Sequence, residues 1–257
     1  MPGRAWSVDM SNYDIFAMYY DSLTKNVHYA GRAEYLLKLL ERFNHPAGIT
    51  LDLACGTGSL TLELYSRGVD VYGADASPSM LSVAKDKAYD AGADILFLCQ
   101  KMQNIDLYGT VDTVICALDS INHLQSAAQI QAAFNRVSLF MNPGGYFVFD
   151  FNTVYKHRNI LKDNIYVYDT DDVYCVWQNR YRPSNNQVDI TLDFFEKNGD
   201  TYLRSREHFA EITFEQGVVA GMLEKSGLSV EAVFDDMTFN SPKEDSQRII
   251  FVTKKQE

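Results

Sequence analysis

The chain has 257 residues, 46% of them apolar, a length that predicts one large domain or a core with an inserted subdomain. Its 23 basic and 34 acidic side chains give a net charge of −11, which disfavours a partner held by its phosphate backbone. No charged leader precedes an apolar stretch and no apolar run approaches the roughly 18 residues of a membrane span, so we expect a soluble, cytoplasmic protein.

Aromatic residues recur at helical spacing near the N-terminus, at Tyr13, Phe16, Tyr19 and Tyr20. This spacing predicts a helix that either packs its stripe on the core or covers a ligand. The apolar pattern of residues 34–43 predicts a second helix, which should cover one face of a sheet.

A short apolar strand over residues 49–53 ends in a turn that contains Gly56 and Gly58, and a second strand over 69–75 ends in Asp75. Both glycines permit positive φ and a close approach of a ligand to the backbone. Asp75 would offer two carboxylate oxygens to the diol of a ribose. These features predict a nucleoside site in a strand–helix–strand unit.

The nucleoside is not expected to be a dinucleotide, because Thr61 stands where the pyrophosphate fingerprint requires a third glycine. Strand and helix patterns alternate as far as Asp150, as a parallel sheet with crossover helices requires. Alternating strands then follow up to residue 213, and their turns at 184–186 and 198–199 predict an antiparallel meander. Residues 229–235 and 248–254 predict a terminal antiparallel hairpin.

Several motifs of the chain resemble those of the class I S-adenosylmethionine-dependent methyltransferases. The first is Leu51-Asp52-Leu53-Ala54-Cys55-Gly56-Thr57-Gly58, and the others span residues 73–81, 97–102, 112–120 and 143–150. The resemblance implies a seven-stranded, mostly parallel Rossmann-like sheet with a terminal antiparallel hairpin. Residues 1–151 and 214–257 would then form the cofactor-binding core with an N-terminal lid helix, and residues 152–213 an inserted antiparallel β subdomain for acceptor binding or dimerisation.

The resemblance also implies S-adenosyl-L-methionine as the cofactor and a set of residues around it. Asp75 would hold the ribose hydroxyls, Met80 would flank the adenine, and Asp52 would order the glycine turn and the amino end of the cofactor. The full expected set is Tyr13, Tyr20, Arg32, Asp52, Ala54, Gly56, Gly58, Asp75, Ala76, Met80, Lys101, Met102 and Leu118.

Two positions depart from the family pattern. Many relatives carry Asp where this chain has Lys101, so the adenine contact would fall to the backbone or to Met102. A Trp often stands where Gly31 or Arg32 falls here; Arg32 would either pair with the cofactor carboxylate or be solvated.

An amine or hydroxyl acceptor can also require a base for its proton. The family's loop after the fourth strand borders the methyl group, which makes Asp119 and His123 the expected catalytic residues. Further options are Asp150 with Asn152, and Glu207 with His208. The remaining histidines, His28, His45 and His157, stand in polar surroundings and are given no role.

The residue pattern predicts no metal site, because no cluster has metal-ligand spacing. Three of the four cysteines lie in apolar strand patterns, so buried reduced thiols are expected at Cys55, Cys99, Cys116 and Cys175 rather than disulfides.

The expected function is methyl transfer to a small-molecule nitrogen or oxygen nucleophile. One alternative is methylation of RNA or protein, and another is a regulatory or scaffold protein that binds the cofactor without catalysis. A nicotinamide dehydrogenase is disfavoured by Thr61 and by the terminal hairpin. The expected partners are a small-molecule acceptor and, by analogy with the amino-sugar N-methyltransferases, a second copy of the chain, with no membrane and no nucleic acid.

Overall fold

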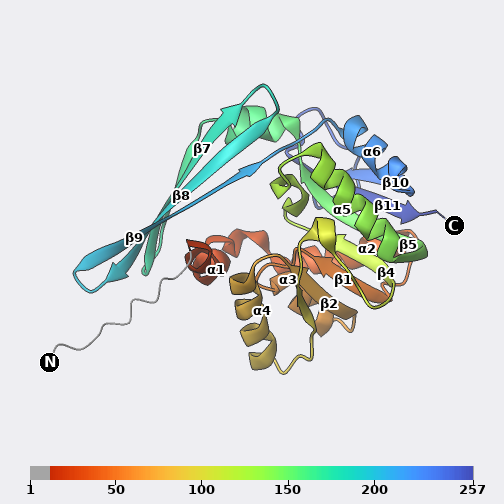
Figure 1. The fold of residues 1–257 in the computed structure, drawn as a ribbon, viewed down its shortest axis with the longest axis horizontal. Coiled ribbons are helices and arrows are strands. Elements are labelled where there is room, and N and C mark those ends of the chain that lie inside the picture. Colours follow the sequence, from red (N-terminus) through yellow and green to blue (C-terminus); the bar gives the residue numbers. More distant parts are fainter. Residues whose placement is uncertain (1–11, 257) are drawn as a thin grey trace.

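The computed structural model describes residues 12–256, and of residues 12–15 and 25 only the backbone. A seven-stranded sheet lies at its centre, in the order β10-β11-β5-β4-β1-β2-β3 (Figure 1). Its strands are β1 (Ile49–Leu53), β2 (Asp70–Asp75), β3 (Phe97–Cys99), β4 (Val111–Cys116), β5 (Met141–Asn152), β10 (Leu228–Asp235) and β11 (Arg248–Lys255). Strands β1 to β5 pair in parallel, whereas β11 pairs antiparallel with β5 and β10. The expected fold class is therefore confirmed.

Helices cover both faces of this sheet. The helices are α1 (Asn12–Leu23), α2 (Tyr29–Arg42), α3 (Ser59–Ser66), α4 (Pro78–Asp90), α5 (Ala127–Phe140) and α6 (Gln216–Lys225), with shorter helical turns η1 (Lys25–Val27), η2 (Met102–Asn104), η3 (Ser120–His123) and η4 (Lys156–Leu161). Apolar residues of α5 and α6 form one core cluster with the sheet, and those of α2 and α3 form a second. Burial on both faces explains why the parallel strands read as nearly continuous apolar runs.

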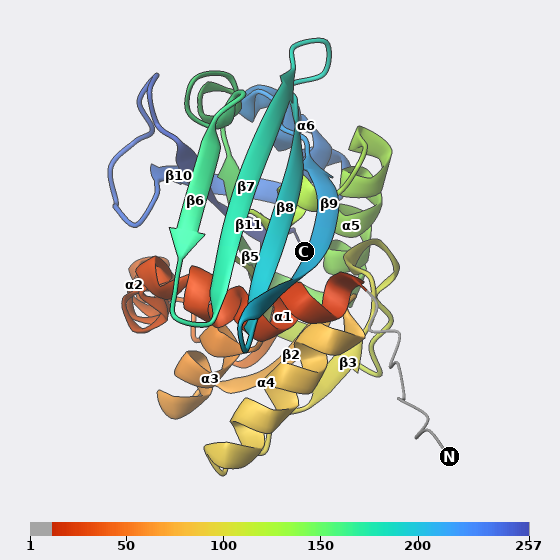
Figure 2. The same cartoon turned by 90° about the vertical axis from the view of Figure 1, so that its left-hand side faces the viewer.

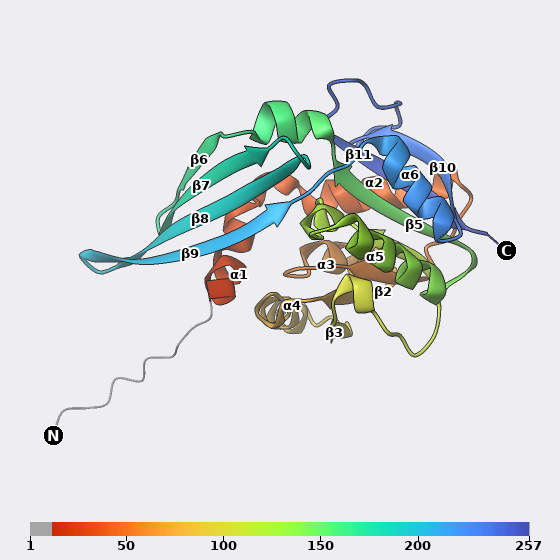
Figure 3. The same cartoon turned by 45° about the horizontal axis from the view of Figure 1, so that its top comes forward.

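The residues between β5 and α6 form a separate four-stranded antiparallel sheet, as the turn residues predicted. Its strands are β6 (Ile165–Asp169), β7 (Val173–Arg182), β8 (Gln187–Asn198) and β9 (Thr201–Glu211), paired in that order. Figure 2 shows these strands side by side, with α1 crossing between them and the core. The Phe16 ring of α1 lies 6.2 Å from each of the rings of Phe194 and Phe209. Helix α1 therefore joins the second sheet to the core (Figure 3).

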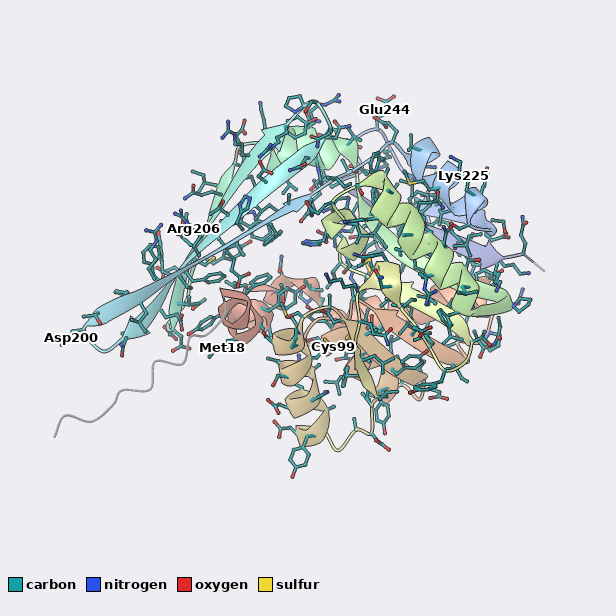
Figure 4. The ribbon with its side chains drawn as sticks, in the orientation of Figure 1. Met18, Cys99, Asp200, Arg206, Lys225 and Glu244 are labelled. Atoms are coloured by element: carbon teal, nitrogen blue, oxygen red, sulfur yellow. The ribbon has the colours of Figure 1, made fainter. Side chains whose placement is uncertain are left out.

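The prediction that all four cysteines are buried was wrong in part. Cys99, labelled in Figure 4, is exposed because it ends the edge strand β3, and Cys55 in the glycine turn is half-buried, whereas Cys116 and Cys175 are buried; all four are free thiols. His157 is completely buried although its sequence neighbours are polar. Among the described residues, no helix is both long enough and apolar enough to cross a membrane.

Candidate active site

The glycine turn lies where β1 ends, and it leaves open space above the sheet. Gly56 has a φ of 54°, and a Cβ placed on it would meet no atom within 4 Å. Gly58 has a φ of 72°, and a Cβ there would lie 2.9 Å from the Cβ of Ala84 in α4. Gly58 thus permits close helix packing, whereas Gly56 leaves room for a ligand.

Asp75 ends β2 and holds the glycine turn from the side. Its Oδ2 accepts a hydrogen bond from the Gly56 N–H at 2.9 Å, and its Oδ1 accepts one from the Ser77 N–H at 2.8 Å. Burial raises the pKa of Asp75 above its ordinary value, although backbone hydrogen bonds oppose this rise. Each oxygen keeps further acceptor capacity, so two hydroxyl donors would stabilise the carboxylate.

A pocket of about 650 Å³ runs from Asp75 to the second sheet. One end is lined by β2, the start of α4 and η2, where Ala76, Met80, Lys101 and Met102 lie. The other end is lined by residues of α1, the loop after β4, and β9, namely Phe16, Tyr20, Leu118, Ser120, His123, Glu207 and Phe209. A volume of this size suits a nucleoside together with a second small molecule.

A side cavity of about 30 Å³ adjoins the glycine turn and contains Asp52. Asp52 is only 2% exposed, and one of its oxygens accepts a hydrogen bond from the Thr61 hydroxyl at 2.6 Å. Burial raises the pKa of Asp52 to about 7, aided by the nearby Asp75 and opposed by the Thr61 hydrogen bond. Thr61, which stands where the dinucleotide fingerprint has its third glycine, thus supplies a hydrogen-bond partner for the Asp52 carboxylate. An ammonium group that entered the cavity would favour the ionised form of Asp52.

Helix α1 is tied to the glycine turn through Asp21. Its Oδ1 accepts hydrogen bonds from the hydroxyls of Thr57 at 2.7 Å and Ser59 at 3.0 Å. Its Oδ2 accepts one from the Lys87 ammonium at 2.7 Å. Tyr20, one residue before Asp21, lines the pocket. Helix α1 therefore contacts both the second sheet and the turn. Its role as a cover over a ligand stays a prediction.

The loop after β4 is strained and held in place by Asp150 of β5. Leu118 and Asp119 have φ values of 59° and 53°, in the left-handed region that L-residues rarely adopt. Asp150 accepts hydrogen bonds from both of their backbone N–H groups, that of Leu118 at 2.7 Å. Arg32 pairs with the same carboxylate at 3.2 Å and is 5% exposed. A solvated Arg32 is therefore wrong, and its guanidinium supports the loop from behind the pocket.

The surroundings of Asp119 argue against a role as proton acceptor. One oxygen accepts a hydrogen bond from the Arg248 guanidinium of β11, and the other accepts one from the Asn152 amide at 2.8 Å. Burial alone would raise the pKa of Asp119, but the positive charges of Arg248 and Lys156 hold that pKa well below its ordinary value. A carboxylate with so low a proton affinity is a poor base, so the prediction of Asp119 as base loses its physical support.

His123 remains as the base candidate at the acceptor end of the pocket. Its ring is partly exposed, with its centroid 5.2 Å from that of Phe209, and its Nε2 lies 3.8 Å from Glu211 Oε1. Glu207, 5% exposed, points into the same pocket, where it accepts a hydrogen bond from the Phe16 N–H. Strand alternation places the neighbouring His208 on the outer face of the second sheet, away from the pocket.

One group of side chains in the described part of the chain has a spacing that could suit a metal ion. Ligand atoms of Asp119, His123 and Glu211 lie within 4.8 Å of one another, a cluster that the sequence spacing did not indicate. Arg248 and Asn152 already bind both oxygens of Asp119. The nearby guanidinium would repel a cation, so these contacts favour an ion-pair network over a metal centre.

Most of the residues expected around a cofactor lie together. Ala54, Gly56, Asp75, Ala76, Met80, Lys101, Met102, Leu118 and Tyr20 line the large pocket, and Asp52 lines the adjoining cavity. Gly58 shapes the turn, Arg32 lies behind it, and the Tyr13 side chain lies outside the described residues. Sequence reasoning missed Arg248, Glu211 and Asp21; only Asp21, which ends the aromatic stripe, carried a signal.

Comparisons with known proteins agree with this geometry. Residues 50–145 match the family model described as "Methyltransferase domain". The chain is 31% identical over 244 residues to "Putative methyltransferase YqeM" of Bacillus subtilis, which covers 95% of this chain and 97% of that protein.

Two solved structures are similar along nearly the whole chain. One is an S-adenosylmethionine-dependent methyltransferase from Clostridium acetobutylicum, with a TM-score of 0.86, 28% identity, and coverage of 96% of this chain and 100% of that one. The other is the sugar N-methyltransferase KedS8 from Streptoalloteichus sp., with a TM-score of 0.77, 20% identity, and coverage of 100% and 99%. At 20% identity the second likeness concerns the fold alone.

Proposed function

Because the chain belongs to the class I S-adenosylmethionine-dependent methyltransferases, we propose that it methylates a nitrogen or oxygen of a small molecule, with an amine nitrogen as the favoured acceptor. The observation that carries this proposal is the single pocket that joins Asp75 at one end to His123 and Glu207 at the other.

The pocket suits the cofactor in shape and chemistry. Asp75 would accept hydrogen bonds from the ribose hydroxyls, Met80 and Met102 would flank the adenine, and Asp52 would face the ammonium of the methionine moiety. Bound there, S-adenosylmethionine supplies a methyl group already activated by its sulfonium. The protein's own contribution is then to orient the acceptor, exclude water and accept a proton.

An amine fits the acceptor end better than an anionic group does. The buried Glu207 carboxylate would attract an ammonium or hydrogen-bond an amine, and the rings of Phe16 and Phe209 offer faces that favour cations. Lys101 is the one lysine or arginine among the described lining residues, and it lies next to Met102 at the opposite end. The name of the structural neighbour KedS8, a sugar N-methyltransferase, agrees with an amine acceptor.

His123 would accept the proton that the acceptor loses. The amine must present a free lone pair to form the new N–C bond, so an ammonium has to release a proton before or during methylation. His123 reaches the same pocket, and a neutral imidazole is a suitable proton acceptor near neutral pH. The strained loop that carries His123 is held by Asp150, which fixes the position of this base.

The other functions weighed from the sequence are less well supported. The net charge of −11 disfavours an RNA substrate. A pocket that continues from the nucleoside end to His123 disfavours a scaffold without catalysis, because a scaffold needs no acceptor end. Homodimer formation and a cytoplasmic location stay predictions.

The test uses S-adenosylmethionine with a deuterated methyl group and pairs of small molecules that differ only in an amine or a hydroxyl. We expect mass spectrometry to find the labelled methyl on amine members. Glu207→Gln should lower kcat/KM for amines roughly 10- to 150-fold, the value of one hydrogen bond to a charged group. The matched control is Glu41→Gln, an exposed position on α2 that should change nothing. Labelling of the hydroxyl members alone would refute the amine preference, and labelling of protein or RNA alone would refute the substrate class.

A further inference from the structure

A histidine that the reaction does not touch lies beneath the acceptor end of the pocket. His157 of η4 is 0% exposed, and its Nδ1 lies 2.8 Å from the backbone carbonyl oxygen of Asn186. A carbonyl only accepts hydrogen bonds, so Nδ1 must carry a hydrogen. In a neutral ring, Nε2 would then hold a lone pair.

That Nε2 faces a carboxylate. It lies 3.5 Å from Glu211 Oε2, and it makes no hydrogen bond with any described residue. Glu211 is itself 3% exposed, and the same Oε2 accepts a hydrogen bond from the Asn152 amide at 3.0 Å. A lone pair opposite a buried carboxylate would be repulsive, whereas a proton on Nε2 makes the contact attractive.

The other oxygen of Glu211 faces the pocket. Its Oε1 lies 3.8 Å from His123 Nε2. Glu211 therefore stands between two imidazole rings, one sealed in the protein and one open to the acceptor. Alone, this carboxylate would favour a protonated His123, which could no longer accept a proton from the acceptor.

The remaining charges around this group largely cancel. Asp119 is paired with Arg248 of β11. Asp150 is paired with Arg32 and lies 3.8 Å from Arg248, and Arg32 also reaches Asp236. The Lys156 ammonium donates to the side-chain amide oxygen Oδ1 of Asn152 at 2.8 Å. Lys156 and Arg248 also act on Glu211 through their charges, but the printed ion-pair contacts of Glu211 within the described residues are with the two histidines.

We propose that His157 is a permanently protonated imidazolium paired with Glu211, and that this pair positions His123 and keeps it neutral to accept the acceptor's proton. The role of His123 rests on the function proposed above, whereas the charged state of His157 follows from the contacts alone. The Glu211 carboxylate, 3.8 Å from His123 Nε2, would favour the tautomer with its hydrogen on Nε2, which leaves His123 Nδ1 as the atom that takes the proton. His157 and Glu211 are positioning residues in this account.

Protonation can be read without an acceptor, from nitrogen-detected NMR of the imidazole rings at pH 7.5. The chain has only five histidines, which single substitutions assign. In the unmodified protein we expect a doubly protonated His157 and a neutral His123 that carries its hydrogen on Nε2. A neutral His157 in that spectrum would overturn the proposal. If His157→Gln fails to fold, substitutions of the other four histidines still assign His157 by elimination.

Two variants test the coupling. Glu211→Gln should turn His157 into the neutral form with its hydrogen on Nδ1, because the new amide can donate to Nε2. His157→Gln should leave the charge of Glu211 without its partner and raise the doubly protonated fraction of His123. His208→Gln is the matched control on the outer face of β9 and should remove only its own signals. A His157 that stays doubly protonated in Glu211→Gln, or a His123 that stays neutral in His157→Gln, would contradict the pairing.

A kinetic readout separates this proposal from the function it deepens. With an amine that the protein methylates, His157→Gln should move the acid limb of the kcat/KM profile up by roughly one pH unit, the size expected for one lost charge at this range. Equal loss at all pH values would indicate a merely structural role and refute the proposal. The predicted imidazole states in a protein that methylates no amine would refute only the proposed function.

Discussion

The most direct structural prediction concerns Asp75→Ala. The carboxylate accepts two backbone hydrogen bonds, from Gly56 and Ser77, and its remaining capacity faces the pocket. Removing it deletes the acceptor for the ribose diol. One charge-assisted hydrogen bond contributes about 1.5 to 3 kcal/mol, so the affinity for S-adenosylmethionine should fall roughly 10- to 150-fold.

Isothermal titration calorimetry with S-adenosylmethionine and S-adenosylhomocysteine measures this loss, and thermal unfolding shows whether the variant still folds. Asp70→Ala is the matched control, because Asp70 starts the same strand, β2, at its opposite and exposed end. The control should bind as tightly as the unmodified protein. Equal affinity of a folded Asp75→Ala would refute the placement of the ribose.

Three further changes test other parts of the site. Gly56→Val should abolish cofactor binding, because the new side chain enters the pocket. The control is Gly68→Val, at an exposed glycine that also has positive φ and open space; it should lower stability by a similar amount and leave binding intact. Calorimetry with the cofactor distinguishes the two variants. Asp52→Asn should remove a pH dependence of stability. Burial raises the pKa of Asp52 to about 7, so the free energy of unfolding of the unmodified protein should fall as pH rises from about 4 to 7. At pH 8 the variant should be roughly 4 kcal/mol more stable to urea. An unchanged pH dependence would contradict this. The same variant should bind S-adenosylmethionine more weakly, because it loses the charge opposite the ammonium. Asp119→Asn should keep an acid limb in the kcat/KM profile and move it to lower pH, because a negative charge near His123 is lost. Loss of that limb would restore Asp119 as the base.

The glycine turn and Asp75 were predictable because their signal is local. The position of Gly56 and Gly58 after an apolar strand restricts the backbone conformation, and the end of β2 places Asp75 beside them. The second sheet was likewise predictable, because strand alternation and the turn residues between the strands are short-range features. Each of these predictions needed only contacts between neighbouring segments.

The charge network under the pocket was not predictable, because it joins residues far apart in the chain. Arg248 reaches Asp119 from β11, and Glu211 reaches His157 from the end of β9. Their separations of 129 and 54 positions leave no periodic pattern. For the same reason, the local sequence could suggest Asp119 as a base but could not show the guanidinium that lowers its proton affinity.

The central claim is that one continuous pocket brings a nucleoside at Asp75 and an acceptor at His123 together. A crystal structure with bound S-adenosylhomocysteine tests it most directly. The account predicts the ribose hydroxyls on the Asp75 carboxylate, the amino group beside Asp52, and the sulfur directed toward the part of the pocket lined by His123 and Glu207. A nucleoside bound elsewhere, or a sulfur directed away from His123, would contradict it.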